Sequence, residues 1–152
     1  VRSRSRFESN ANGASMGETA LIRRVSFPAS HRYWVEEWSP ERNREAFGAT
    51  TETHDHTFEV EVEVVGPPEP VTGMVVDLGR VDDALERLVV TPLSGRDLNE
   101  AIPEVAARTV QPSTEFLARW VWERLSGELA APLRVSRVRV TESPDLSSEF
   151  RS

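Results

Sequence analysis

The stretch HTFEVEVEVVG, residues 56–66, alternates apolar and polar side chains almost without interruption. Successive side chains of a β-strand point to opposite faces, so one face would be apolar and the other would carry a threonine and three glutamates. This period is typical of an antiparallel strand buried on one face and solvated on the other. Gly66 and the two prolines after it end the strand. The apolar residues of the expected core face are Phe58, Val60, Val62 and Val64.

Three further segments have strand character. Residues 20–31 alternate in part and favour a strand that ends near His31, whereas 133–142 alternate valines with polar residues. Residues 147–152 favour a last short strand. Residues 1–19 have little apolar content and no periodicity, so we expect a disordered tail or a cloning remnant there and a folded domain over 20–152.

Two helices are expected between the strand pairs. Apolar residues recur at helical spacing over 77–90, after Asp77 as N-cap, and over 112–130, after Ser113 or Thr114. Polar and turn residues favour a long loop over 34–53, and 91–111 is expected to be mostly loop. The order strand–strand–helix–helix–strand–strand is that of an α+β fold.

Composition limits the compartment and the class of partner. The chain has 152 residues, enough for one domain, and no cysteine. Disulfides, thiolate metal sites and cysteine nucleophiles are therefore excluded. The net charge of −7 argues against nonspecific nucleic-acid binding. We see neither a secretory signal nor an apolar run of about 18 residues, and expect a cytoplasmic protein with no nucleic-acid or membrane partner.

The three histidines of the chain predict a metal site. His54 and His56 are two residues apart at the start of a strand, so their imidazoles would lie on one face. His31 ends the preceding strand, which antiparallel pairing would bring alongside. Three neutral imidazoles with an open fourth position are typical of catalytic zinc. The alternative is that these are surface or capping histidines, and Asp55 either orients a ligand or points to the other face.

Several short motifs resemble those of the 6-pyruvoyl-tetrahydropterin and 6-carboxy-tetrahydropterin synthase family, in the family's order. FPASH resembles its Phe-x-Ala-x-His, and HDH resembles its His-Gly-His. FGAT resembles the start of Phe-Gly-x-Cys-x-x-x-His, and GMVVD resembles Gly-Met-Val-x-Asp. LSGRDLN resembles Leu-Asp-His-x-x-Leu-Asn, the start of the second helix resembles Pro-Thr-x-Glu-x-x-Ala, and VRVTES resembles Val-x-Glu-Thr. These matches begin at residues 27, 54, 47, 73, 93, 112 and 138, respectively.

The resemblance implies the tunnelling fold, an antiparallel four-stranded sheet with two helices on one face, assembled as a trimer or hexamer whose sheets join into a barrel. It also implies Zn²⁺ on the three histidines and a pterin-like small molecule as ligand. Glu142 would grip the pterin ring, and Glu115 with Thr114 would line the pocket. From the residues alone, Glu115 could instead cap its helix, and Glu142 could face solvent on its strand.

The sequence departs from the family pattern at the groups that move protons. Thr50 stands where the family has a cysteine base, and Ser94 and Gly95 stand where it has an Asp–His pair. A threonine hydroxyl is too weak a base to replace the thiolate directly at neutral pH. Carboxylates near the lost groups could serve instead, with Glu52 first, followed by Asp55 and Asp97.

Three functions follow from these residues. The first is a zinc-dependent lyase acting on a dihydroneopterin-triphosphate-like pterin, either to make 6-carboxy-tetrahydropterin on the route to deazapurines such as queuosine or to catalyse a divergent reaction. The second is a non-catalytic pterin- or purine-binding module that kept the metal. The third is a structural subunit. The intact histidines and Glu142 count against the third, and Thr50, Ser94 and Gly95 count against standard chemistry.

Overall fold

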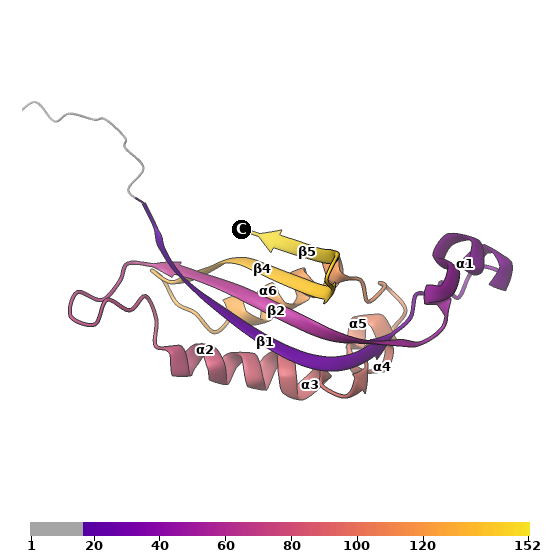
Figure 1. Cartoon of the computed structure of the whole chain (residues 1–152), viewed down its shortest axis with the longest axis horizontal. Coiled ribbons are helices and arrows are strands. Elements are labelled where there is room, and N and C mark those ends of the chain that lie inside the picture. The colour runs from indigo at the N-terminus through magenta and orange to yellow at the C-terminus, as the bar shows by residue number, and fades with distance from the viewer. Residues whose placement is uncertain (1–16) are drawn as a thin grey trace, which may run out of the picture.

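The computed structural model describes residues 17–152, so most of the predicted tail at 1–19 lies outside the described residues. The long strands are β1 (Thr19–His31), β2 (His54–Gly66), β4 (Arg134–Ser143) and β5 (Leu146–Arg151). They pair antiparallel in the order β1-β2-β4-β5. Helices α2 (Leu78–Leu85) and α6 (Thr114–Ser126) cover one face of this sheet (Figure 1). The predicted α+β fold with two principal helices is confirmed.

A short parallel strand extends the sheet beyond the four predicted strands. Strand β3 (Arg96–Asp97) pairs with β1 at Ala29 and Ser30, so the sheet has five strands in the order β3-β1-β2-β4-β5. Two residues cannot display an alternating pattern, and the pairing depends on where the chain returns after the first long helix. Strand β3 was therefore not predictable from local pattern.

The segments predicted as loops contain short helices. Helix α1 (Pro40–Phe47) and the 3₁₀ turn η1 (Gly48–Thr51) occupy the predicted loop 34–53, and α1 lies at one end of the molecule (Figure 1). Ser39 caps α1 by accepting a hydrogen bond from the Arg42 N–H, which is a recognisable start signal. The helix has few apolar residues, so periodicity did not reveal it.

The chain between α2 and α6 also winds into short helical turns. The predicted helix 77–90 consists of α2 followed by a π-helical turn, η2. Residues 91–111, predicted as mostly loop, contain three helices of three or four residues each. The bounds are η2 Glu86–Val90, α3 Thr91–Leu93, α4 Leu98–Ala101 and α5 Pro103–Ala106. Within residues 17–152, no helix has the length and apolarity needed to cross a membrane.

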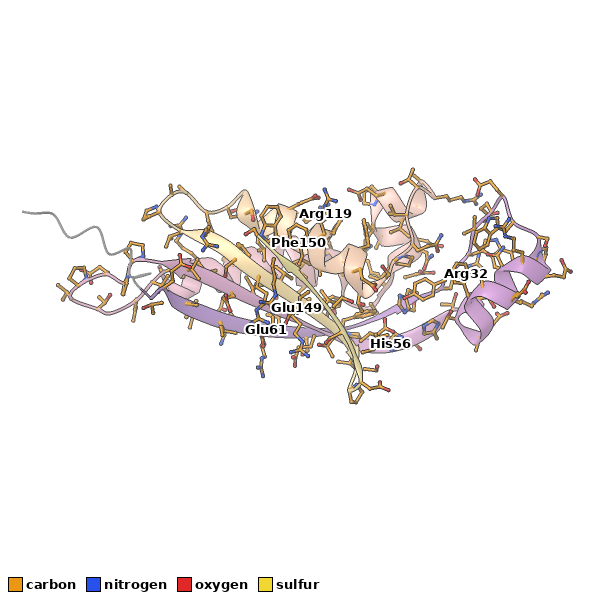
Figure 2. The ribbon with its side chains drawn as sticks, turned by 90° about the horizontal axis from the view of Figure 1, so that it is seen from above. Arg32, His56, Glu61, Arg119, Glu149 and Phe150 are labelled. Carbon is orange, nitrogen blue, oxygen red and sulfur yellow. The ribbon has the colours of Figure 1, made fainter. Side chains whose placement is uncertain are left out.

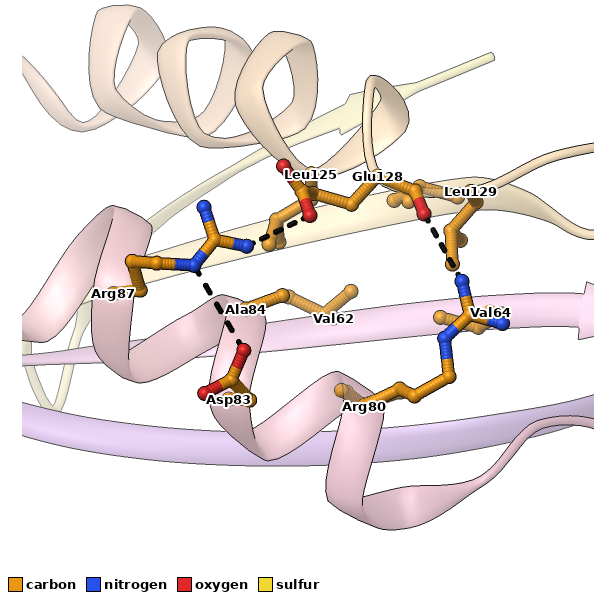
Figure 3. A pocket seen from close by; sticks show the side chains of 11 residues that line it. Val62, Val64, Arg80, Asp83, Ala84, Arg87, Leu125, Glu128 and Leu129 are labelled. Carbon is orange, nitrogen blue, oxygen red and sulfur yellow. Dashed lines mark hydrogen bonds and ion pairs between the residues drawn. The ribbon is translucent and has the colours of Figure 1, made fainter.

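The core lies between the sheet and its two helices. The predicted apolar face of β2 is buried there, with Phe58 fully inaccessible and the three valines at most 2% exposed. Leu85 of α2 and Leu117 and Val121 of α6 belong to the same core. A small cavity of ≈ 100 Å³ remains between α2, α6 and the sheet, beneath ion pairs from Arg87 to Asp83 and Glu128 (Figure 3). None of the predicted site residues lines it.

The opposite face of the sheet carries a charge network centred on Glu61 and Arg137. The Arg137 guanidinium lies 2.6 Å from Glu61 Oε1 and 3.1 Å from Glu149 Oε1, and Arg24 also donates to Glu61. Figure 2 labels the two glutamates of this network, Glu61 and Glu149. Burial alone would raise the pKa of Glu61, but hydrogen bonds from Arg24 and Arg137 hold it below its usual value. The ionised form of Glu61 therefore stabilises the fold.

We expect Glu61→Gln to lower the free energy of unfolding by about 1–2 kcal/mol at pH 7, because charge-assisted hydrogen bonds to two arginines are lost. Since the folded state lowers the pKa of Glu61, its contribution is present above the ordinary glutamate pKa and is lost as the pH falls through the folded value. The loss of stability on acidification should thus be smaller in the variant. Urea unfolding of metal-free protein at pH 7 and pH 3.5 measures both effects, with Glu59→Gln on the same face as control. Equal effects of the two substitutions would contradict the assignment.

Candidate metal centre and ligand cleft

The three histidines meet at the paired ends of β1 and β2. The antiparallel register places His31 opposite His54 and Ala29 opposite His56. One nitrogen of each imidazole lies within 4.8 Å of one nitrogen of each of the others. The predicted metal-ligand set is therefore brought together, and His31 is the completely buried member of it.

Backbone carbonyls set the tautomers of two of these imidazoles. His31 Nδ1 lies 2.9 Å from the Pro112 carbonyl oxygen, and His54 Nδ1 lies 2.8 Å from the Glu52 carbonyl oxygen. A carbonyl oxygen only accepts hydrogen bonds, so each Nδ1 carries the proton and donates it. Each Nε2 is left with a free lone pair, as a metal ligand requires.

Burial favours the form of His31 that binds metal. Loss of solvation lowers the pKa of His31 to about 4, with smaller contributions from the neighbouring His54 and His56. The imidazole is therefore neutral near pH 7. Since a protonated imidazole cannot coordinate an ion, this environment favours metal binding at neutral pH.

Buried polar atoms without partners converge on one point. His31 Nε2, His56 Nε2 and Glu142 Oε2 are all buried and make no hydrogen bond within the described chain. Glu142 Oε2 lies 3.8 Å from His31 Nε2, and Glu142 Oε1 lies 4.0 Å from His56 Nε2. These separations are too long for hydrogen bonds. The ligand nitrogens of the three histidines, within 4.8 Å of one another, could share one ion. The residues thus fit a three-histidine zinc site with Glu142 at its border.

A cleft beside the histidines contains the other predicted binding residues. Tyr33, Phe47, Thr114, Glu115 and Leu146 line a space of ≈ 310 Å³, together with Gln111 and Ser113. Glu115 is exposed in this cleft, and the hydroxyl of Ser113, rather than Glu115, caps α6 by accepting from the Phe116 N–H. Thr114 is buried, with its hydroxyl 2.7 Å from that of Ser148.

Tyr33 links the cleft to the histidines. Its ring centroid lies 5.3 Å from that of His31 and 5.7 Å from that of Phe47. Burial raises the pKa of Tyr33 to about 12, and the negative charges of Glu142 and Glu115 add to the effect. Tyr33 therefore lies within the field of both predicted pterin-binding carboxylates, and its ring lines the same cleft as Glu115.

The three candidate bases occupy different environments. Glu52 is exposed, and its backbone carbonyl is the one that orients His54. Asp55 lies on the strand face opposite to its histidine neighbours and lines a separate cleft of ≈ 400 Å³ with His56, Gly95 and Arg96. Asp97 caps α4 by accepting from the Asn99 N–H at 2.9 Å.

Thr50, Ser94 and Gly95, the residues predicted to stand at the family's proton-transfer positions, make ordinary structural contacts. The Thr50 hydroxyl donates to the Phe47 carbonyl at 2.6 Å. The Ser94 N–H donates to the Val90 carbonyl, and the Gly95 N–H donates to the Pro28 carbonyl at 2.7 Å. The Thr50 hydroxyl is thus occupied by a backbone acceptor, and Gly95 has no side chain to offer.

Sequence reasoning missed Tyr33, Gln111 and Pro112. Tyr33 could have been predicted as a neighbour of the site, because a residue two positions after His31 points to the same face if the chain stays extended. Pro112 contributes a backbone carbonyl, which no residue pattern marks. Gln111 hydrogen-bonds to the backbone of Trp34, which is far from it in sequence, so this contact exists only in the folded chain.

Comparison with known proteins places this geometry in a family. Residues 20–152 match the family described as 6-pyruvoyl tetrahydropterin synthase. A 6-pyruvoyl tetrahydrobiopterin synthase of Poecilia reticulata is 34% identical over 128 residues, 83% of this chain and 86% of the relative. A dihydroneopterin monophosphate aldolase of Pyrococcus furiosus is 30% identical over 130 residues, 86% of this chain and 95% of the relative.

The fold is also similar to that of a solved structure from the same family. The structure of Caenorhabditis elegans 6-pyruvoyl tetrahydropterin synthase superposes with a TM-score of 0.80 at 24% identity, covering 90% of this chain and 97% of that one. The family match covers the whole sheet and both principal helices, including the three histidines and Glu142. The chain belongs to the 6-pyruvoyl tetrahydropterin synthase family.

Proposed function

We propose that the protein binds Zn²⁺ through His31, His54 and His56 and binds or acts on a pterin related to dihydroneopterin triphosphate. The observation that carries the proposal is that three buried, unpartnered atoms, His31 Nε2, His56 Nε2 and Glu142 Oε2, belong to side chains that lie close together. A zinc ion held by the histidines would act as a Lewis acid on side-chain oxygens of the substrate.

Glu142 is the residue that would hold the pterin ring. Its two carboxylate oxygens can accept hydrogen bonds from the ring N–H and the exocyclic amine of a 2-aminopyrimidinone. Glu142 Oε2 makes no hydrogen bond within the described chain and is available to accept one, and the carboxylate lies near both the histidines and Tyr33. The adjoining cleft offers Tyr33 and Phe47 as aromatic walls and Glu115 and Thr114 as polar contacts. A ring held by Glu142 would therefore direct its side chain towards the metal ligands.

Proton transfer would have to come from a residue other than those at the family positions. Glu52 is our first candidate for the base, since its backbone already contacts His54 and its side chain is exposed. A divergent reaction has a specific precedent in sequence, because the Pyrococcus furiosus relative is named as an aldolase rather than a synthase. The alternative is a pterin-binding protein without turnover.

The sheet edges support a homo-oligomer, which we propose to be a trimer or hexamer with the sheets joined into a barrel. Among residues 17–152, β3 covers the outer edge of β1 only at Ala29 and Ser30, and β5 ends the sheet on the other side. The rest of the outer edge of β1 and that of β5 present backbone groups that a second copy can pair with.

Glu142→Gln is expected to weaken the binding of 7,8-dihydroneopterin to zinc-loaded protein by about 10–100-fold, because one charge-assisted hydrogen bond is lost and a donor replaces an acceptor. Isothermal calorimetry measures the effect, with the zinc content of each sample determined first. Glu123→Gln, on the exposed side of α6, is the control and should bind like the wild type. Unchanged affinity in Glu142→Gln would contradict the ring-binding role. A wild-type protein that binds no pterin would contradict the proposed function itself.

A further inference from the structure

Three side-chain amides hydrogen-bond to the backbone of the segment just after His31. Each binds both the N–H and the carbonyl of a single residue in the segment 32–35, as a neighbouring strand would. Asn99 contacts Arg32 at 2.9 and 3.0 Å, and Gln111 contacts Trp34 at 3.0 and 2.9 Å. Asn43 contacts Val35 at 2.8 and 2.9 Å. We call these pairs of hydrogen bonds the amide brackets.

The first two brackets lie next to the metal ligand. Strand β1 ends at His31, so its ladder stops where the ligand stands. Asn99 fixes the residue that immediately follows His31. Gln111 directly precedes Pro112, whose carbonyl accepts the hydrogen bond from His31 Nδ1. The Gln111 side chain also binds the backbone of Trp34 and so connects the two segments. The Asn99 bracket thus fixes the backbone next to His31. The Gln111 bracket fixes the segment whose carbonyl accepts the hydrogen bond from the His31 imidazole.

We propose that Asn99 and Gln111 are positioning residues that orient His31 for metal binding, an inference that rests on the proposed zinc function. A carboxamide offers a donor and an acceptor in one rigid plane, and both brackets use the two together. A carboxylate of the same shape would keep the bond from the N–H but would set an oxygen against the carbonyl. The His31 imidazole or its Pro112 acceptor would then shift, and loss of such orienting contacts typically costs about 10–100-fold in metal affinity.

Asn43 supplies an internal control. Its amide makes the same two-point contact, but with Val35, and it also donates to the carbonyl of Ser39 at 3.2 Å. Asn43 is completely buried and ties α1 to the loop, and its side-chain hydrogen bonds within residues 17–152 go to Val35, Trp38 and Ser39 rather than to Arg32 or Pro112. Breaking this bracket should loosen the protein without moving the ligand.

The test compares zinc affinity across the wild type, Asn99→Asp, Gln111→Glu and Asn43→Asp by chelator competition. Urea unfolding of each metal-free protein reports general damage, and the visible absorption of the Co²⁺ form reports the ligand geometry. We expect zinc binding to weaken by about 10–100-fold in Asn99→Asp and Gln111→Glu, with an altered Co²⁺ spectrum. Asn43→Asp should lower the denaturation midpoint but retain the wild-type zinc affinity and spectrum.

Wild-type zinc affinity and Co²⁺ spectra in Asn99→Asp and Gln111→Glu would overturn the inference and leave the proposed function intact. An equal loss of zinc affinity in Asn43→Asp would also overturn it, because the effect would then be general loosening. A wild-type protein that binds no zinc would overturn both. If a carboxylate variant fails to fold, Gln111→Met and Asn99→Ala remove the same contacts without adding charge, and the outcomes named above apply to them in the same way.

Discussion

Replacing His54 with alanine is expected to abolish stoichiometric zinc binding, while the wild-type protein retains close to one zinc ion per chain. His54 lies in register with His31 and offers its free Nε2 to the same point, so its removal leaves two imidazoles. The loss of affinity should exceed the roughly 10–100-fold that is typical of losing a residue that only orients a ligand. Metal analysis after zinc reconstitution and gel filtration measures the content directly.

Asp55→Asn is the matched control for this experiment. Asp55 sits between the two strand-borne ligands, but its side chain belongs to the other face of β2 and lines the cleft with Gly95 and Arg96. Its zinc content should stay at the wild-type value. A wild-type protein that takes up no zinc after reconstitution would show that the histidine cluster is not a metal site.

The second large effect is a deficit in turnover. We expect the zinc-loaded protein to convert dihydroneopterin triphosphate by the standard synthase reaction about 10²–10⁴-fold more slowly than a family member with the usual groups, because a positioned general acid or base contributes that much. The Thr50 hydroxyl is occupied by the Phe47 carbonyl, and Gly95 has no side chain. Product analysis under saturating substrate gives the rate. Rapid wild-type turnover would contradict the prediction and direct attention to Glu52, Asp55 and Asp97.

Restoring the family groups is the corresponding gain-of-function experiment. The combined variant Thr50→Cys, Ser94→Asp and Gly95→His should regain part of the rate. Gly95 has a φ of 71°, and a Cβ added there would meet no atom within 4 Å, so the cost is backbone strain rather than a clash. If the wild type instead shows a divergent activity, Glu52→Gln should remove it while leaving zinc content unchanged.

Much of the sheet could be predicted from local pattern. Phe58 and the valines after it alternate with glutamates, and a strand with this pattern buries its apolar face whatever it pairs with. The same period placed His54 and His56 on one face. Helix α6 was equally readable, since Ser113 caps it and its apolar residues recur at helical spacing. Where local pattern was weak, as in α1 and β3, the prediction was wrong.

Sequence by itself determined the fold class, the strand that carries two of the candidate ligands and the residue types available for chemistry. Tertiary structure alone decided that His31 stands opposite His54, that Glu142 from β4 borders the same point, and that the carbonyl of Pro112 fixes a tautomer. The physical reason is range. Periodicity and capping act within a few residues, whereas strand register, desolvation and backbone acceptors from 81 residues away exist only once the chain has packed.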